Sequence, residues 1–366
     1  MNTRPELADW LRLTLVPGIG GETQRKLLAA FGLPAAIFTA GHSALRAVVG
    51  TRAAQLLLDT DNQLAVERAL AWSAQPAQHL VCLADPEYPQ ALLQTPDPPT
   101  LVYVRGRLDL LNSPTLAVVG SRNPTPQGSA NAKRFASALA EAGLTIASGL
   151  ALGIDAAAHR GALAAAGDTV AFIGTGIDRS YPAANHELAR EIAGKGSIIS
   201  EFPLGTPPSG ANFPRRNRLI AGLAHGTLVV EATTDSGSLI TARIASELGR
   251  EVFAIPGSIH SPQSRGCHKL LKQGAKLVES VQDVLDELRW TSPARRPVES
   301  PEAAGEAPAL LACMGFDPCS VDELAVRSGL TAEDVSVKLL HLELAGAIAG
   351  LPGGRYQRIS QAGKAP

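Results

Sequence analysis

Short apolar runs alternate with longer segments of helical spacing through the middle of the chain. The run at 116–119 is followed by Gly120, and Thr125 and Pro126 then precede an Ala-rich segment that extends to Gly143. Threonine is a preferred N-cap residue, proline suits the first helical position, and glycine commonly ends a helix. The pattern therefore predicts a strand, a glycine turn and a helix.

The same alternation continues to about Trp290. Apolar runs predict strands at 116–119, 144–147, 169–173, 197–200, 227–230, 251–254 and 276–278, and helical spacing predicts helices at 155–166, 185–193, 215–224 and 238–248. Repeated strand–helix units imply an α/β fold with a mostly parallel sheet and helices on both faces. In such sheets, ligands bind at the carboxyl ends of the strands.

We assign the sheet domain to residues 76–290, and two smaller domains are expected beside it. The Pro-rich start of the sheet domain, at 79–114, predicts an edge strand and a strap that enters the sheet. Residues 1–75 are expected to be helical. The segment 291–308 is rich in proline and charge, which predicts a flexible linker. Residues 309–366 contain a capping box, a tight turn between two helices and a hairpin, the pattern of a winged helix.

A glycine-rich turn in the N-terminal region, Pro17-Gly18-Ile19-Gly20-Gly21, precedes a predicted helix and resembles half of a helix-hairpin-helix module. The turn amides of such modules hold a nucleic-acid phosphate. A single hairpin is a weak signal, so a plain glycine turn in a small helical domain is the favoured interpretation.

Composition limits the classes of function. The formal net charge is −1 and aromatic residues make up only 4% of the chain, so nucleic-acid binding must come from a local basic patch with few stacking rings. The four scattered cysteines predict reduced thiols without a zinc site. No signal peptide or membrane-spanning run is present, which predicts a cytoplasmic protein.

Three loops after predicted strands carry the candidate chemistry. Gly120, Ser121 and Arg122 combine a close-approach glycine, a hydroxyl and a guanidinium suited to phosphate; the alternative is an ordinary turn with an exposed arginine. The segment at 213–218 places three arginines at a helix start, where cations are unfavourable unless an anion is bound. Its candidate residues are Phe213, Arg215, Arg216, Asn217 and Arg218.

Arg215 and Arg218 are three residues apart and should share one face of that helix. Phe213 could stack on a base, although a salt-bridged surface helix with Phe213 in the core is the alternative. Ser236, Gly237 and Ser238 form the third loop, whose hydroxyls and amides could hold phosphate, and Lys269 follows the next glycine turn. P-loop, dinucleotide-binding and nucleophile-elbow motifs are absent, so we expect no cofactor, metal or catalytic residue.

The motif series is similar to that of one known family. Its members share the motifs that read here Gly120-Ser121-Arg122, Ser148-Gly149-x-Ala151-x-Gly153-Ile154-Asp155-x-x-Ala158-His159, Gly174-Thr175-Gly176, Tyr181-Pro182-x-x-Asn185, Phe213-Pro214-x-Arg216-Asn217-Arg218-x-Ile220, Ser236-Gly237-Ser238-Leu239-x-Thr241-Ala242 and Pro256-Gly257-Ser258. In type and order these resemble the DprA/Smf DNA-processing proteins, over nearly the whole chain.

This resemblance implies a sterile-alpha-motif-like helical domain, an extended Rossmann domain and a winged-helix tail. It also implies a non-enzymatic protein that binds and protects single-stranded DNA during natural transformation, loads RecA recombinase and displaces single-strand-binding protein, and that forms a homodimer through the Rossmann domain. The family's basic pocket corresponds to Arg122 and the 213–218 segment. Some members carry a lysine a few residues before the phenylalanine, where this chain has the neutral Ser209, Gly210 and Ala211.

Two other functions are compatible with parts of the sequence. A nucleotide-processing enzyme of the phosphoribohydrolase-like Rossmann class would have a related crevice, but its Pro-Gly-Gly-x-Gly-Thr-x-x-Glu motif is missing. A transcription regulator with a ligand-sensing crevice is the other. The presumed recognition helix is acidic, because Glu333, Asp334 and Glu343 outweigh Lys338 and His341. This argues against regulation through DNA and favours a protein partner for the winged helix, with DNA contact by Arg355 and Arg358 in the wing as the alternative.

Overall fold

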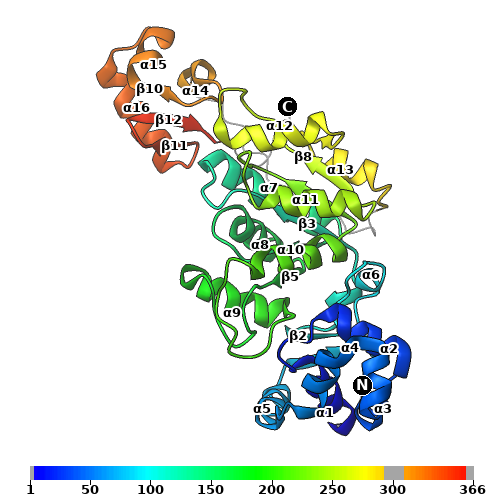
Figure 1. The fold of residues 1–366 in the computed structure, drawn as a ribbon. Coiled ribbons are helices and arrows are strands. Elements are labelled where there is room, and N and C mark those ends of the chain that lie inside the picture. Colours follow the sequence, from blue (N-terminus) through cyan, green and yellow to red (C-terminus); the bar gives the residue numbers. More distant parts are fainter. Residues whose placement is uncertain (1–3, 292–308, 360–366) are drawn as a thin grey trace.

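The computed structural model describes residues 4–291 and 309–359. Figure 1 shows three parts in a row: a helical domain at the N-terminal end, a sheet domain in the middle and a small domain at the opposite end. The predicted linker at 291–308 lies outside the described residues except for Thr291. No helix in the described part of the chain is long and apolar enough to cross a membrane.

The N-terminal part is built from helices alone, as the sequence predicts. They are α1 (Arg4–Thr14), α2 (Gly21–Phe31), α3 (Pro34–Thr39), α4 (His42–Asp59) and α5 (Gln63–Ser73). The glycine turn joins α1 to α2, and Gly18 adopts a φ of 83°, a backbone conformation that favours glycine. Leu13, Leu27, Ile37 and Leu57 form the buried centre of this domain.

A nine-stranded sheet forms the middle of the molecule. Its strands are β1 (Gln78–Cys82), β2 (Leu101–Gly106), β3 (Thr115–Val119), β4 (Thr145–Ser148), β5 (Thr169–Phe172), β6 (Ser197–Ser200), β7 (Gly226–Val229), β8 (Glu251–Ala254) and β9 (Lys276–Leu277), in the order β1-β2-β6-β5-β4-β3-β7-β8-β9. Pairing is parallel from β6 through to β9. The predicted edge strand and strap are instead two antiparallel strands, β1 and β2, that extend the sheet beyond β6.

Helices cover both faces of this sheet because its central strands are apolar on both sides. In β3, Leu116 and Val118 face one core while Ala117 and Val119 face the other. The helices are α6 (Gln90–Leu93), α7 (Pro126–Glu141), α8 (Ile154–Ala164), α9 (His186–Lys195), α10 (Asn212–Leu223), α11 (Ser238–Glu247), α12 (Arg265–Lys272) and α13 (Val281–Glu287), with single turns at Asp109–Asn112, Ala183–Asn185 and Pro262–Ser264. A fully buried parallel sheet reads as continuous apolar runs, which is why its strands were predictable.

The order in which strands are added to the sheet reverses at β3, although the strands on both sides of it are parallel. From β3 the strands add outward through β4, β5 and β6, and the chain then returns to place β7 on the other side of β3. Ligands of open α/β sheets bind where the strand order reverses, beyond the carboxyl ends of the two diverging strands. A ligand site is therefore expected at the loops after β3 and β7.

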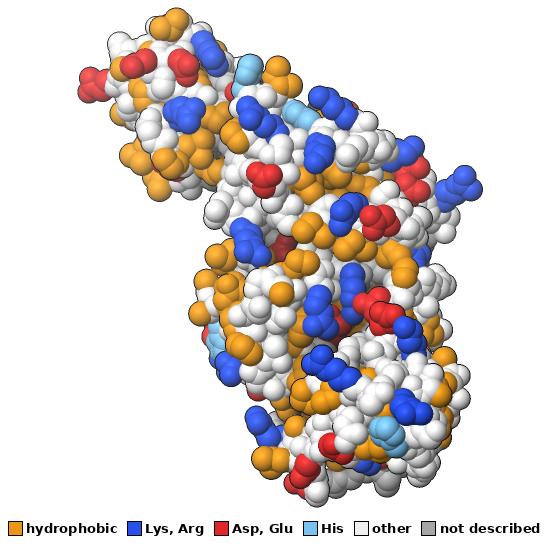
Figure 2. Space-filling model, in the orientation of Figure 1, with side chains coloured by type: hydrophobic (Ala, Val, Ile, Leu, Met, Phe, Trp, Pro, Cys, Tyr) orange, Lys and Arg blue, Asp and Glu red, His pale blue; other side chains and the backbone are white. Residues whose placement is uncertain are grey.

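The C-terminal domain is a winged helix, in agreement with the sequence pattern. It comprises α14 (Ala309–Met314), α15 (Val321–Ser328), α16 (Ala332–Leu344) and an antiparallel sheet of β10 (Cys319–Ser320), β12 (Arg355–Arg358) and β11 (Ile348–Leu351). The capping box forms, with the Ser320 amide donating to Glu323 over 2.8 Å. Hydrophobic side chains remain exposed on this domain (Figure 2), among them Val337, Leu340 and Leu344 of α16.

Candidate nucleic-acid interface

A cleft of about 570 Å³ lies at the reversal point of the sheet. Its walls come from the loop after β3, the loop after β7 and the first turns of α10. Predicted site residues that line it are Gly120, Ser121, Arg122, Phe213, Arg216, Asn217, Ser236, Gly237 and Ser238. The structure thus brings together residues from all three candidate loops, which are far apart in the sequence.

We call this cavity the Arg122 cleft. Arg122 lines it and lies beside two aromatic rings. Its guanidinium carbon is 5.3 Å from the centroid of the Phe213 ring, and the Phe213 and Tyr181 centroids are 5.8 Å apart. Arg122 is exposed, and the described residues offer it no ion pair. Tyr181 is 44% exposed and belongs to one of the family motifs, but it was not among the predicted site residues. Its contact with Phe213 joins two distant segments of the sequence, so only the folded structure shows it.

The wall contributed by α11 is polar. The Ser236 and Ser238 hydroxyls are 2.7 Å apart, and the Asn217 amide nitrogen donates to the carbonyl of Gly237 over 3.4 Å. The N-cap residue of α11 is Gly237, which provides no side-chain cap, and the Ser238 amide donates to the Ser236 hydroxyl over 3.3 Å. The positive end of this helix therefore meets the cleft beside two hydroxyls, which favours an anion there.

The start of α7, the helix predicted after Gly120, is occupied by a carboxylate of the protein itself. The carboxylate of Glu231 lies there, accepting from the Thr125 amide over 2.9 Å and from the Thr125 hydroxyl over 2.6 Å. A side chain at Gly128 would collide with this carboxylate. Burial raises the pKa of Glu231, and the two hydrogen bonds oppose that rise. The anion that this helix start attracts is thus supplied by the protein itself.

The loop after β4 is occupied in the same way. Asp155 is buried, and its Oδ2 accepts from the amides of Gly149 over 3.1 Å and of Ala151 over 3.4 Å. Burial raises the Asp155 pKa, while the nearby charge of Arg216 and these amides lower it. The glycine-rich loop between β4 and α8 therefore binds a carboxylate of the protein itself.

Arg216 lies beneath the cleft, contrary to the expectation of an exposed arginine cluster. It is 4% exposed, its Nη1 donates to the carbonyls of Gly149 and Phe172, and its Nε donates to Asn217 over 3.1 Å. Burial lowers its pKa to about 10, opposed by the charge of Asp155, so the guanidinium is still charged at neutral pH. It sets the potential of the cleft floor and orients Asn217.

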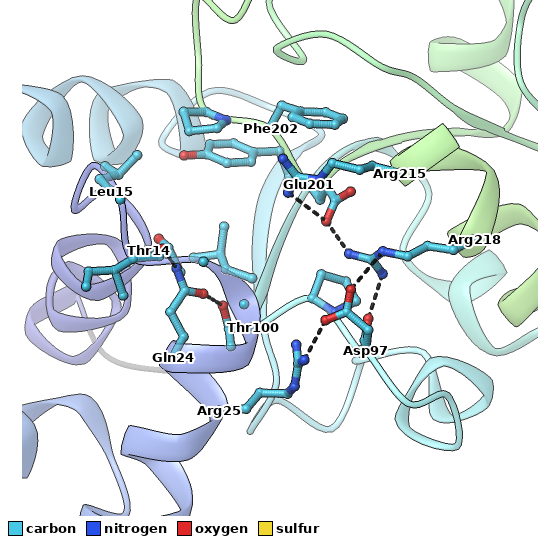
Figure 3. A pocket seen from close by; sticks show the side chains of 18 residues that line it. Thr14, Leu15, Gln24, Arg25, Asp97, Thr100, Glu201, Phe202, Arg215 and Arg218 are labelled. Carbon is cyan, nitrogen blue, oxygen red and sulfur yellow. Dashed lines mark hydrogen bonds and ion pairs between the residues drawn. The ribbon is translucent and has the colours of Figure 1, made fainter. Parts of the chain in front are cut away.

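Arg215 and Arg218 share one face of α10, as their spacing predicts, but that face looks away from the Arg122 cleft. Figure 3 shows them around Glu201 in a second cavity. Arg218 pairs with Glu201 and, at 3.1 Å, with Asp97, whereas Arg215 lies 3.8 Å from Glu201. The predicted arginine cluster is thus divided, and for Arg218 the salt-bridged alternative describes the structure.

Lys269 is exposed on α12 and does not line the Arg122 cleft. His159 is fully buried, its Nδ1 lies 2.7 Å from the Thr169 hydroxyl, and burial lowers its pKa to about 3; it packs within the fold. Asp155 lines the cleft, but its carboxylate already accepts hydrogen bonds from backbone amides. No group of three potential metal ligands occurs in the described ranges. This geometry suits non-covalent binding of a phosphate with a neighbouring base.

Comparisons with known proteins agree with this description. The chain matches a family model described as DNA recombination-mediator protein A over residues 79–289 and a DprA winged-helix model over 293–354. It is 41% identical to Protein Smf of Escherichia coli K12 over 96% of both chains. It is also 49% identical to DprA of Streptococcus pneumoniae R6 over 57% of this chain and 73% of that protein.

Two solved structures are similar to the fold. The X-ray structure of DprA from Streptococcus pneumoniae has a TM-score of 0.68 and 39% identity, covering 78% of this chain and 98% of that one. A structure of DprA from Helicobacter pylori, which concerns its single-stranded DNA binding mode, has a TM-score of 0.53 and 32% identity, covering 58% of this chain and 96% of that one.

Proposed function

The chain belongs to the DprA/Smf family of DNA-processing recombination mediators, and from this premise we propose that it binds single-stranded DNA in the Arg122 cleft and passes the strand to RecA. The observation that carries the proposal is the pairing of an exposed arginine, free of carboxylates among the described residues, with the Phe213 ring 5.3 Å away. The arginine can pair with a phosphate of the strand, and the neighbouring ring can stack on the base attached to it.

Binding of this kind uses the groups on the cleft wall in distinct ways. Arg122 and the start of α11 hold the phosphate, and Phe213 and Tyr181 offer ring faces to a base. The buried charge of Arg216 adds a favourable potential from below. Because phosphate contacts and stacking carry little sequence information, the protein should bind DNA of any sequence and lose affinity as salt rises.

Delivery to RecA is proposed from family membership. In the same way we propose displacement of single-strand-binding protein, a homodimer formed through the sheet domain and a place in the cytoplasm. For the winged helix we propose a protein partner, since α16 combines Glu333 and Asp334 in its first turn with exposed Leu340 and Leu344. An acidic helix with apolar side chains is unsuited to the DNA major groove.

The binding step is tested by fluorescence anisotropy with single-stranded and duplex oligonucleotides at two salt concentrations. Arg122→Ala should weaken single-strand affinity by about 1–3 kcal/mol, the range for a lost charge-assisted contact. Arg190→Ala is the matched control, an exposed arginine on α9 that is paired with Glu187 at 3.5 Å. Equal affinity of wild type and Arg122→Ala at moderate salt would refute the proposed site.

The later step is tested by RecA filament formation on DNA already coated with single-strand-binding protein. Wild-type protein should shorten the lag before RecA hydrolyses ATP, and Arg122→Ala should not. Release of a free base on incubation with nucleoside monophosphates would instead favour the phosphoribohydrolase-like alternative.

A further inference from the structure

A second cavity, of about 470 Å³, lies between the helical domain and the sheet domain. One wall is the glycine turn that resembles a helix-hairpin-helix element, from Gly18 to Gly21. The opposite wall is formed by Glu201, Arg215 and Arg218 (Figure 3). Basic side chains gather on the surface where the two domains meet, interspersed with acidic ones (Figure 2).

Hydrogen bonds hold the glycine turn and α2 in place against the sheet domain. The Gln24 side chain donates to the Ile19 carbonyl of the turn over 3.0 Å and accepts from Thr100 over 2.5 Å. Arg25 of α2 donates to the Pro98 carbonyl over 2.9 Å and pairs with Asp97 at 2.5 Å, and Asp97 also pairs with Arg218. Asp97 therefore lies between one arginine from each domain. The turn is a fixed wall of the cavity, so its amides have a defined direction.

Several polar groups at this cavity lack partners in the described structure. The Tyr103 hydroxyl belongs to a residue that is 2% exposed, and Oε1 of Glu201 belongs to a side chain that is 5% exposed; neither atom has a hydrogen bond. Gly20 cannot cap the eleven-residue α2 with a side chain. Buried polar atoms are normally satisfied, and a helix start without a cap attracts anions.

Arg215 connects this cavity with the Arg122 cleft. It is 59% exposed and lines the second cavity, while its neighbours Pro214 and Arg216 line the Arg122 cleft. The two sites are therefore separated by the first turns of α10, and an α-helix with its side chains is about 10–12 Å wide. A single DNA strand can cross that width while staying in contact with Arg215.

We propose that the cavity is a second subsite for the strand bound at Arg122, an inference that rests on the proposed function. A phosphate lies between Arg215 and the first amides of α2. The Tyr103 hydroxyl donates a hydrogen bond to the attached nucleotide, and Oε1 of Glu201 accepts one from its base. The helical domain thereby lengthens the DNA-binding path beyond the sheet domain.

The decisive variant is Gly20→Asp. Gly20 has an extended backbone, and no atom lies within 4 Å of the position that a Cβ would take, so a side chain fits there. Aspartate is a preferred N-cap, so it should satisfy the α2 amides while placing a negative charge where the phosphate would lie. Gly20→Asn is the matched control, because it caps the helix equally well without the charge. Thermal midpoints no lower than that of wild type would show that both variants fold.

Affinity is measured by anisotropy on oligothymidylates of about 2 and about 20 nucleotides, because a dinucleotide is too short to contact both sites across the roughly 10–12 Å width of α10. On the long strand, Gly20→Asp should bind about five- to tenfold more weakly than Gly20→Asn. On the short strand the two variants should be equal, since Arg122 alone holds it. Equal affinity of the two variants on both strands would overturn the second subsite.

Arg122→Ala separates this failure from failure of the proposed function. If the proposed function is right, Arg122→Ala weakens both strands regardless of how the Gly20 variants behave. If Arg122→Ala changes neither, the first site is wrong, and a charge effect at Gly20 would then locate DNA binding in the second cavity alone.

Discussion

Replacing Arg216 by methionine should damage the fold much more than removing Arg122 does. Methionine has a similar length and no charge, so the substitution removes the donors that reach the Gly149 and Phe172 carbonyls and leaves Asp155 without its nearby cation. Leaving a buried polar group unsatisfied costs about 1–3 kcal/mol, and leaving a buried charge uncompensated costs about 3–5 kcal/mol. Since these terms overlap, we expect about 3–5 kcal/mol of destabilisation.

Urea unfolding followed by circular dichroism measures this difference. Arg122→Ala, on the exposed side of the same cleft, should stay within about 0.5 kcal/mol of wild type. Adding Asp155→Asn to Arg216→Met should recover part of the loss, because the double variant no longer leaves a buried charge unpaired. A loss below about 1 kcal/mol for Arg216→Met would refute the assignment of Arg216 to the cleft floor.

Three further outcomes follow from the structure. Gly128→Ala should destabilise the protein by about 1–3 kcal/mol, against the usual preference for alanine in helices, because the new methyl group meets the Glu231 carboxylate; a stabilised variant in thermal melts would contradict this. Burial holds the His159 pKa at about 3, below its unfolded value, so the unfolded state binds more protons and stability is lost as pH falls from about 6.5 toward 3. Between pH 7 and 5 this should cost wild type about 2 kcal/mol relative to His159→Asn, and parallel pH profiles in urea titrations would argue against it. Deleting residues after Pro308 should leave single-strand affinity within a few-fold in anisotropy titrations; a loss as large as that of Arg122→Ala would assign DNA binding to the winged helix.

The apolar pattern alone was sufficient for the architecture. Each central strand is buried on both faces and each helix has a buried stripe, so local periodicity carries the information that tertiary packing later uses. The capping box at Ser320 and the caps at Thr125 and Thr331 were equally local, because a cap satisfies amides within its own turn. The antiparallel pair of β1 and β2 was only half predicted, since strand pairing is a long-range contact.

The occupancy of the helix starts was decided by tertiary structure. Glu231 reaches Thr125 across 106 positions of sequence, and no spacing rule relates them. The sequence therefore indicated a helix start after Gly120, but not that the carboxylate of Glu231 lies at it.

The arginines at 215–218 show the same division. Helical spacing determines that Arg215 and Arg218 share a face that Arg216 does not share. Which of the two faces is buried depends on what packs against α10, and here the sheet domain covers Arg216 while Glu201 and Asp97 meet Arg218. Periodicity is a property of one helix or strand, whereas burial and charge pairing depend on contacts between elements. The sequence therefore determined the fold and the types of residue at the carboxyl edge of the sheet. Only the folded structure decided which of those charged side chains is available to a ligand.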